Sequence, residues 1–89
     1  MIAMQISLYP LGKKDIVPDL ESFWEILKKS NIDHKVTPLS TIVYGSDEDK
    51  IYATVLKAYR SVRKNTRAVM VTTLTSGTEK EIGELIKFL

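Results

Sequence analysis

Cysteine is absent from the sequence, and histidine occurs only once. The absence of cysteine excludes disulfide bonds, thiolate zinc sites, iron–sulfur clusters and cysteine nucleophiles. A metal-binding or acid–base role for His34 would need a second group to orient its ring, and no neighbour supplies one at a recognisable spacing. Serine–histidine–aspartate, HExxH and phosphate-loop motifs are also missing. We therefore expect a protein that is not an enzyme and carries no metal or cofactor.

The chain also lacks an excess of one charge and any long apolar run. Its 13 Lys and Arg residues against 11 Asp and Glu residues leave a net charge of +2. This balance gives no electrostatic reason to expect binding to nucleic acid or to a membrane. No segment approaches the ~20 apolar residues that cross a bilayer, and the first residues do not resemble a signal peptide. We expect a cytoplasmic protein.

Four runs with strand character are present in the 89 residues, a length that indicates a single domain over 1–89. Apolar residues alternate strictly over 2–9, which predicts a strand with one face in the core. Shorter runs rich in β-branched residues predict three further strands at 34–37, 41–44 and 67–75.

Three segments have helical spacing. Apolar residues three and four positions apart predict helices over 18–30 and from about 47 to 64, the second with Ser46 as its N-cap. Thr78 and Glu81 form a capping-box pattern, which predicts a short terminal helix.

The order β-α-β-β-α-β-α predicts an α+β protein whose first six elements form a ferredoxin-like βαββαβ sandwich, with an extra C-terminal helix. Right-handed crossovers give an antiparallel sheet of strand order 4-1-3-2, with two helices on one face. The second strand then lies at a sheet edge, where Pro38 is tolerated.

The other face of this sheet would remain uncovered. We expect it to carry alternate residues of the first and last strands, namely Gln5, Ser7, Tyr9, Met70, Thr72 and Leu74. This mixture is more apolar than an ordinary solvated face, as is typical of a contact surface. Self-association through the sheet is the favoured interpretation, and coverage by the terminal helix is the alternative.

Residues 37–41 (TPLST) combine three hydroxyl groups with a proline between two strands. Hydroxyls offer donors and acceptors without charge, which suits a small polar ligand better than catalytic proton transfer. A second interpretation stays open, in which the segment is a tight strand connection whose hydroxyls satisfy local backbone groups.

Three motifs occur in order along the chain: residues 6–12 (ISLYPLG), the TPLST segment followed by Gly45, and the pair Thr72-Thr73. With them the chain resembles the small thiamine-binding, YkoF-like family. The resemblance implies ferredoxin-like subunits that assemble through their sheets into dimers or tetramers. It also implies binding of thiamine or its hydroxymethylpyrimidine precursor, without catalysis, in vitamin uptake or salvage.

The resemblance also implies which residues form the site. The hydroxyls expected to bind an aminopyrimidine ring are those of Ser7, Thr37, Ser40, Thr41 and Thr72, and the apolar walls are Pro38, Leu39 and Val43. Many members of the family have an acidic residue where this chain has Tyr44. A tyrosine offers the cationic thiazolium only a cation–π contact of ~0.5–2 kcal/mol, which favours the neutral pyrimidine alcohol over thiamine.

A function of a different class also fits the topology. The chain would then be an ACT-like regulatory or structural module whose oligomer interface is its function, without a thiamine-type ligand.

Overall fold

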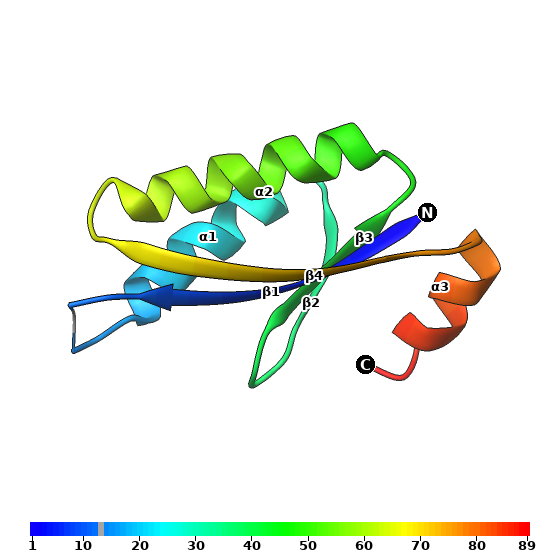
Figure 1. Cartoon of the computed structure of the whole chain (residues 1–89), viewed down its shortest axis with the longest axis horizontal. Coiled ribbons are helices and arrows are strands. Elements are labelled where there is room, and N and C mark those ends of the chain that lie inside the picture. The colour runs from blue at the N-terminus through cyan, green and yellow to red at the C-terminus, as the bar shows by residue number, and fades with distance from the viewer. Residues whose placement is uncertain (13) are drawn as a thin grey trace.

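The computed structural model describes residues 1–12 and 14–89, and within them seven elements follow one another in the order β-α-β-β-α-β-α (Figure 1). The strands are β1 (Ile2–Pro10), β2 (Asp33–Val36), β3 (Thr41–Gly45) and β4 (Ala68–Ser76). The helices are α1 (Val17–Lys29), α2 (Glu48–Arg63) and α3 (Glu79–Ile86). The predicted α+β class and element order are confirmed.

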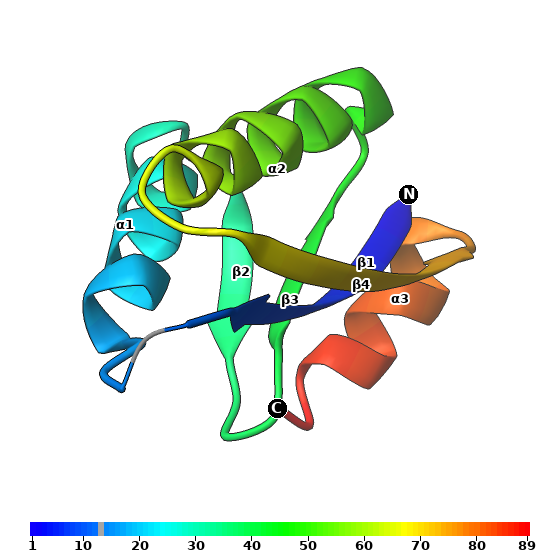
Figure 2. The same cartoon turned by 60° about the vertical axis from the view of Figure 1, so that its left-hand side comes forward.

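The four strands form one antiparallel sheet of order β2-β3-β1-β4, which is the predicted order read from the other edge. Helices α1 and α2 both cover one face of this sheet, as the two views in Figures 1 and 2 show. The ferredoxin-like arrangement is therefore confirmed. Strand β2 lies at an edge, and Pro38 falls in the turn after it, where a missing backbone N–H costs no ladder hydrogen bond.

The limits of α1 and α2 follow local rules. Pro18 lies in the first turn of α1, where its missing N–H is harmless, and Asn31, with a left-handed φ of 55°, follows the end of that helix. The predicted N-cap of α2, Ser46, is wrong by one position. Asp47 caps this helix instead, because its carboxylate accepts a hydrogen bond of 3.1 Å from the backbone N–H of Lys50.

The core lies between the two helices and the sheet. It is built mainly from β1, from the inner faces of α1 and α2, and from Val43 at the centre of β3. Phe23 and Leu27 of α1 and Val62 of α2 are almost completely buried. Each such side chain stabilises the fold by about 1.5–3 kcal/mol relative to an exposed position.

The expected face assignment of the last strand is wrong by one residue. Met4, Ile6 and Leu8 of β1 pair with Leu74, Thr72 and Met70 of β4. Because cross-strand partners share a face, these β4 residues lie on the helix side. The partners of Gln5, Ser7 and Tyr9 on the open face, opposite α1 and α2, are instead Thr73, Val71 and Val69.

Helix α3 lies on the open face of the sheet, opposite α1 and α2 (Figure 1). Its capping box is confirmed, since Thr78 and Glu81 exchange hydrogen bonds of 3.0 and 3.1 Å between side chain and backbone. The helix buries Ile82, and its last turn borders a groove of about 260 Å³ above Ala3, Gln5 and Thr75 among others. It therefore covers one end of the open face only.

Candidate functional site

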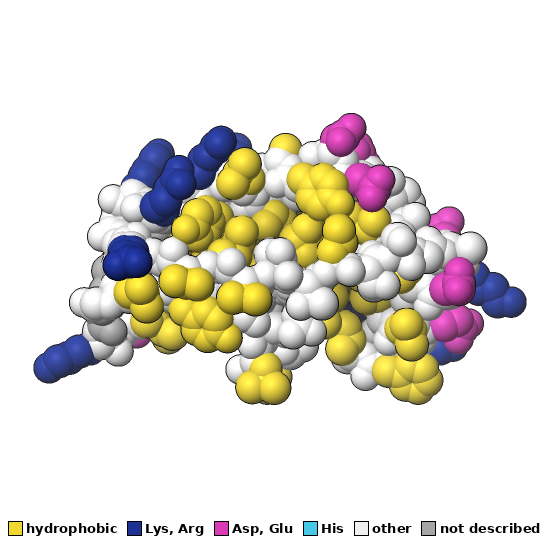
Figure 3. All heavy atoms as spheres, in the orientation of Figure 1, with side chains coloured by type: hydrophobic (Ala, Val, Ile, Leu, Met, Phe, Trp, Pro, Cys, Tyr) yellow, Lys and Arg dark blue, Asp and Glu magenta, His cyan; other side chains and the backbone are white. Residues whose placement is uncertain are grey.

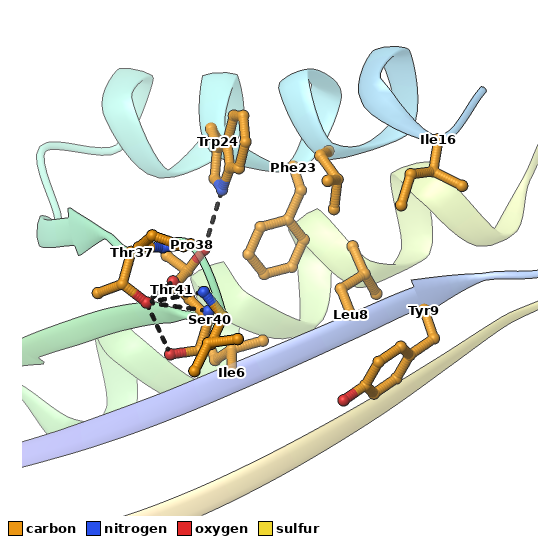
Figure 4. Close-up of a pocket in the computed structure, with 12 residues that line it drawn as sticks. Ile6, Leu8, Tyr9, Ile16, Phe23, Trp24, Thr37, Pro38, Ser40 and Thr41 are labelled. Atoms are coloured by element: carbon orange, nitrogen blue, oxygen red, sulfur yellow. Dashed lines mark hydrogen bonds between the residues drawn. The ribbon is translucent and has the colours of Figure 1, made fainter.

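A pocket of about 220 Å³ opens between the inner face of α1, the second half of β1 and the turn that joins β2 to β3. All five residues of the TPLST segment line it: Thr37, Pro38, Leu39, Ser40 and Thr41. Figure 4 shows Thr37, Pro38, Ser40 and Thr41 at one end of the pocket and apolar side chains from α1 and β1 at the other. The TPLST segment thus forms one wall of this pocket.

The hydroxyl of Thr37 holds the turn in shape. Its oxygen accepts hydrogen bonds from the backbone N–H groups of Ser40 (3.0 Å) and Leu39 (3.3 Å), and its proton is donated to the carbonyl oxygen of Ser40 (3.0 Å). A hydroxyl has one proton and two lone pairs, so all three are engaged here. The second interpretation of the segment, local satisfaction of the backbone, therefore describes Thr37.

Thr41 connects the turn to α1. The indole Nε1–H of Trp24 donates a hydrogen bond of 2.9 Å to the Thr41 hydroxyl oxygen, as the dashed line in Figure 4 shows. Since an indole N–H can only donate, the Thr41 oxygen is the acceptor and its own proton is left to serve a further acceptor. Thr41 is 6% exposed, which places this hydroxyl at the bottom of the polar end of the pocket.

The rest of the lining is mainly apolar and comes from residues that the sequence analysis did not place in the site. From α1 and the residue before it come Ile16, Leu20, Phe23 and Trp24, and from β1 come Ile6, Leu8 and Tyr9. Trp24 could have been recognised from the sequence as a residue near polar groups, because the indole N–H of a half-buried tryptophan needs a hydrogen-bond acceptor. Ile6, Leu8, Ile16, Leu20 and Phe23 have no polar side-chain atom that distinguishes a pocket wall from core packing.

Four of the predicted site residues lie elsewhere. Ser7 and Tyr44 are on the open face, paired with Val71 and Ala3. Thr72 is on the helix side but lines a different depression, between β4 and α2, and Val43 is fully buried in the core. The expectation that the hydroxyls of Ser7 and Thr72 converge with the TPLST segment is therefore wrong, because the sheet register separates them.

Charge is scarce at this pocket. Among the described residues that line it, none is Asp, Glu, Lys, Arg or His. Within residues 1–12 and 14–89 there is also no group of three or more His, Asp or Glu side chains that could hold a metal ion. The Nδ1 atom of His34 lies 2.7 Å from the carbonyl oxygen of Ile32, a local contact outside the pocket. The described lining is therefore mostly apolar, with hydroxyl groups at one end.

No helix in the described part of the chain combines the length and the apolar character that crossing a membrane requires.

Comparison with known proteins identifies one matching family and several solved structures with a similar fold. The YKOF-related family model matches residues 1–79. No curated protein matches the sequence significantly.

Three solved structures are similar over almost the whole chain. Protein SP2199 of Streptococcus pneumoniae aligns with a TM-score of 0.83 at 15% identity, with 97% of each chain covered. Hypothetical protein MJ1052 of Methanocaldococcus jannaschii aligns with a TM-score of 0.82 at 21% identity, covering 99% of this chain and 97% of that one. TM0486 of Thermotoga maritima, a candidate thiamine biosynthesis/salvage protein, aligns with a TM-score of 0.79 at 17% identity, covering 99% and 98%. These identities are low, so the similarity shows the shared fold.

Proposed function

Because the chain belongs to the YKOF-related family, we propose that it binds thiamine or its hydroxymethylpyrimidine precursor without catalysing a reaction. The family and the similarity to TM0486, described as a candidate thiamine biosynthesis/salvage protein, support a thiamine-related role. In this proposal the protein is a cytoplasmic homo-oligomer, a dimer or a tetramer, that serves vitamin uptake or salvage.

The observation that carries the proposal is the pocket between α1 and the TPLST turn. Its volume of about 220 Å³ is smaller than the ~300–1,000 Å³ of pockets that hold drug-sized ligands. A single heterocycle such as the pyrimidine alcohol therefore fits it better than the two rings of thiamine. No carboxylate lines the described pocket to pair with a thiazolium cation, which favours the neutral ligand again.

The proposal gives separate roles to the polar and the apolar residues of the lining. The free proton of Thr41 donates to a ring nitrogen of the pyrimidine, and the Ser40 hydroxyl accepts from its exocyclic amino group. Trp24 and Leu20 form the apolar wall against the ring, while Pro38 and Leu39 form the rim. Thr37 acts on the ligand only by holding the turn.

The lining of this pocket does not include Ser7, Val43, Tyr44 or Thr72. The proposal therefore departs from the site that the family resemblance implies for them, and this difference can be tested directly.

Titration calorimetry with hydroxymethylpyrimidine and with thiamine tests the proposed function. We expect saturable binding of the pyrimidine alcohol by the wild-type protein, weaker binding of thiamine, and a loss of about tenfold in affinity in Thr41→Val, since one hydrogen bond is worth about 0.5–1.5 kcal/mol. No heat with either compound at millimolar concentration would contradict the proposal.

Thr72→Val is the matched control, because it makes the same substitution on the same side of the sheet at a different depression. We expect it to bind the pyrimidine alcohol like the wild-type protein. An equal loss of affinity in Thr72→Val and Thr41→Val would indicate that the ligand does not bind in the TPLST pocket.

The ACT-like alternative is favoured by a separate observation, the apolar side chains exposed on the open face. Tyr9, Val69 and Val71 are 42–53% exposed there. A protein that forms a stable oligomer but gives no heat with either ligand would fit this module and not a binder of pyrimidines.

A further inference from the structure

Strand β4 is an edge of the sheet that lacks the usual protection. Among the described residues it pairs with β1 alone, and Figures 1 and 2 show it running along the outside of the sheet. The N–H and C=O groups of every second residue in an edge strand point away from the sheet, where they can pair with another strand. The nine residues Ala68–Ser76 include no charged residue and no proline. A long edge of this composition readily accepts a further strand.

The opposite edge strand, β2, provides the contrast. It has only four residues, and three of them, Asp33, His34 and Lys35, carry ionisable side chains. Short edge strands and charged side chains are the usual means by which proteins prevent unwanted strand pairing. The sheet is therefore protected at β2 and open at β4, which makes β4 the edge that is suited to a partner.

An apolar depression of about 240 Å³ lies beside this edge, between β4 and α2. Its lining includes Met70, Thr72 and Leu74, which are alternate residues of β4, and Tyr52 and Leu56 of α2. Leu74, Tyr52 and Leu56 are 49%, 41% and 43% exposed. Figure 3 shows the apolar surface that gathers between α2 and β4. Because neighbouring residues on paired strands share a face, every second side chain of an added strand would lie in this depression.

Positive charge gathers where β4 begins. The hydroxyl of Tyr59 donates a hydrogen bond of 2.8 Å to the carbonyl oxygen of Ala68, the first residue of β4, and the guanidinium carbon of Arg63 lies 5.6 Å from the centroid of the Tyr59 ring. Arg63 therefore lies on the β4 side of α2, and Arg67 directly precedes the strand. Residues 50–78 contain no Asp or Glu. Figure 3 shows the basic side chains gathered at this end of the molecule, where they favour an anionic partner.

The unprotected edge, the apolar depression and the cations together describe one kind of partner. An extended protein segment satisfies the backbone groups of the edge, and its alternate apolar side chains fill the depression. If the segment is antiparallel to β4, its C-terminal end lies beside the start of β4, where Arg63 and Arg67 can pair with carboxylates. A nucleic acid would pair with the cations only. A second copy of β4 fits less well, because its nine residues are uncharged and bring no carboxylate to Arg63.

We infer that β4 binds an extended segment of another protein, which adds to the sheet as an antiparallel strand with alternate apolar residues and an acidic C-terminal end. The described linings of the TPLST pocket and of the depression beside β4 have no residue in common. The inference therefore goes beyond the proposed ligand and does not depend on it.

Titration followed by nuclear magnetic resonance tests this contact. The probe is a short synthetic peptide in which valine and threonine alternate and two aspartates form the C-terminal end. We expect saturable changes of chemical shift in β4 and on the side of α2 that faces it. The control peptide has the same composition with the aspartates at its N-terminal end, and it should bind at least tenfold more weakly. Equal affinities of the two peptides, or binding of neither, would overturn the inference.

Methylation of the peptide backbone tests the strand pairing itself. An added strand directs the N–H groups of alternate residues only toward β4. Methyl groups on alternate backbone nitrogens should therefore abolish binding in one frame and leave it intact in the other. Equal effects in the two frames would show that the peptide binds without adding to the sheet.

Arg63→Glu tests the position of the acidic end, and it should weaken binding of the probe peptide at least tenfold. Lys57→Glu is the matched control, because Lys57 lies two residues from Tyr59 and so on a different side of α2. Both side chains are exposed, so circular dichroism should be unchanged in both variants. Equal losses in the two variants would mean attraction by net charge alone and would overturn the proposed placement.

Leu56→Lys distinguishes a foreign segment from a second copy of the chain. It places a charge in the depression without emptying the core, since Leu56 is 43% exposed. We expect this variant to lose binding of the probe peptide while its mass in light scattering stays equal to that of the wild-type protein. A wild-type oligomer that Leu56→Lys dissociates would show that a second copy occupies the edge, and this result would overturn the inference.

Discussion

Trp24 and Thr41 show how single residues connect the fold to the pocket. Their hydrogen bond of 2.9 Å ties α1 to the first residue of β3, and it also fixes which way the Thr41 hydroxyl points. The same side chain therefore supports the structure and serves the proposed ligand. A change at Thr41 will disturb both properties, so they have to be measured separately.

A double-mutant cycle separates them. Trp24→Phe removes the indole donor and keeps an aromatic ring, while Thr41→Val removes the acceptor and keeps the shape. We expect Thr41→Val to cost about 1–3 kcal/mol of unfolding free energy in the wild type, because it leaves the indole N–H without a partner. In the Trp24→Phe background the same change should cost about 0.5–1.5 kcal/mol less, as measured by urea denaturation. If the losses of unfolding free energy in the two single variants add up to the loss in the double variant, the hydrogen bond contributes nothing to stability.

The candidate site could be predicted from the sequence only in part. Residues 37–41 stood out because hydroxyls and a proline are adjacent in the chain, and the structure places them in one pocket wall. Leu20 and Trp24 could not be assigned to the opposite wall, since a pocket wall and a core face have the same helical spacing. The alternation in β1 placed Ser7 on the open face correctly, but the motif alone could not show that the TPLST pocket opens on the other side of the sheet.

Among the elements, α3 has the weakest attachment and the clearest local signal. Its start is fixed by the capping box, in which the hydrogen bonds from the backbone and the side chain of Thr78 lower the pKa of Glu81 below its ordinary value of 4.5. Because the pKa is lower in the folded helix, the stabilisation is complete above pH 4.5 and is lost as the pH falls through the lowered pKa.

Acidification should therefore loosen α3 before it affects the sheet. We expect amide hydrogen exchange in α3 to rise, relative to β1 and β3, as the pH is lowered through this range and after correction for the intrinsic exchange rate. Glu81→Gln keeps a capping side chain without a titrating group, so its α3 protection should not vary with pH in the same way. A wild-type profile identical to that of Glu81→Gln would show that the carboxylate has no part in holding the helix.

Strand β4 shows where an element can be predicted but its orientation cannot. β-branched and apolar residues identify the strand correctly within one residue at each end. Val69, Met70 and Val71 are consecutive and apolar, however, so the alternation does not say which of them faces the helices. A shift of one residue exchanges every side chain between the two faces, and only the pairing of Ile6 with Thr72 decides it.

At the scale of the whole molecule, the order of elements was sufficient to predict the sheet. Right-handed crossovers allow few ways to join two β-α-β units, and β2-β3-β1-β4 is the order that they favour. For α3 the sequence left coverage of the open face as an alternative to self-association, since no crossover rule applies to a helix after the last strand. The structure places α3 over one end of that face.

Tyr9 belongs to two surfaces at once. It lines the pocket together with Leu8, and it is also exposed on the open face, where it pairs with Val69. A guest in the pocket and a second chain on the open face would both contact this ring, so under the proposed function each event would change the free energy of the other. Thermodynamic linkage requires the two effects to be equal in size.

If the protein dimerises, saturating pyrimidine alcohol should therefore change the dissociation constant of the dimer, as measured by sedimentation. The factor of this change should equal the factor by which dimerisation changes the affinity for the ligand. Tyr9→Ala should bring that factor close to one. An unchanged dimer constant in the wild-type protein would show that vitamin capture and assembly are independent. If the factor differs from one, the amount of ligand present would set how much of the protein is assembled, and the binder would also act as a sensor of its own ligand.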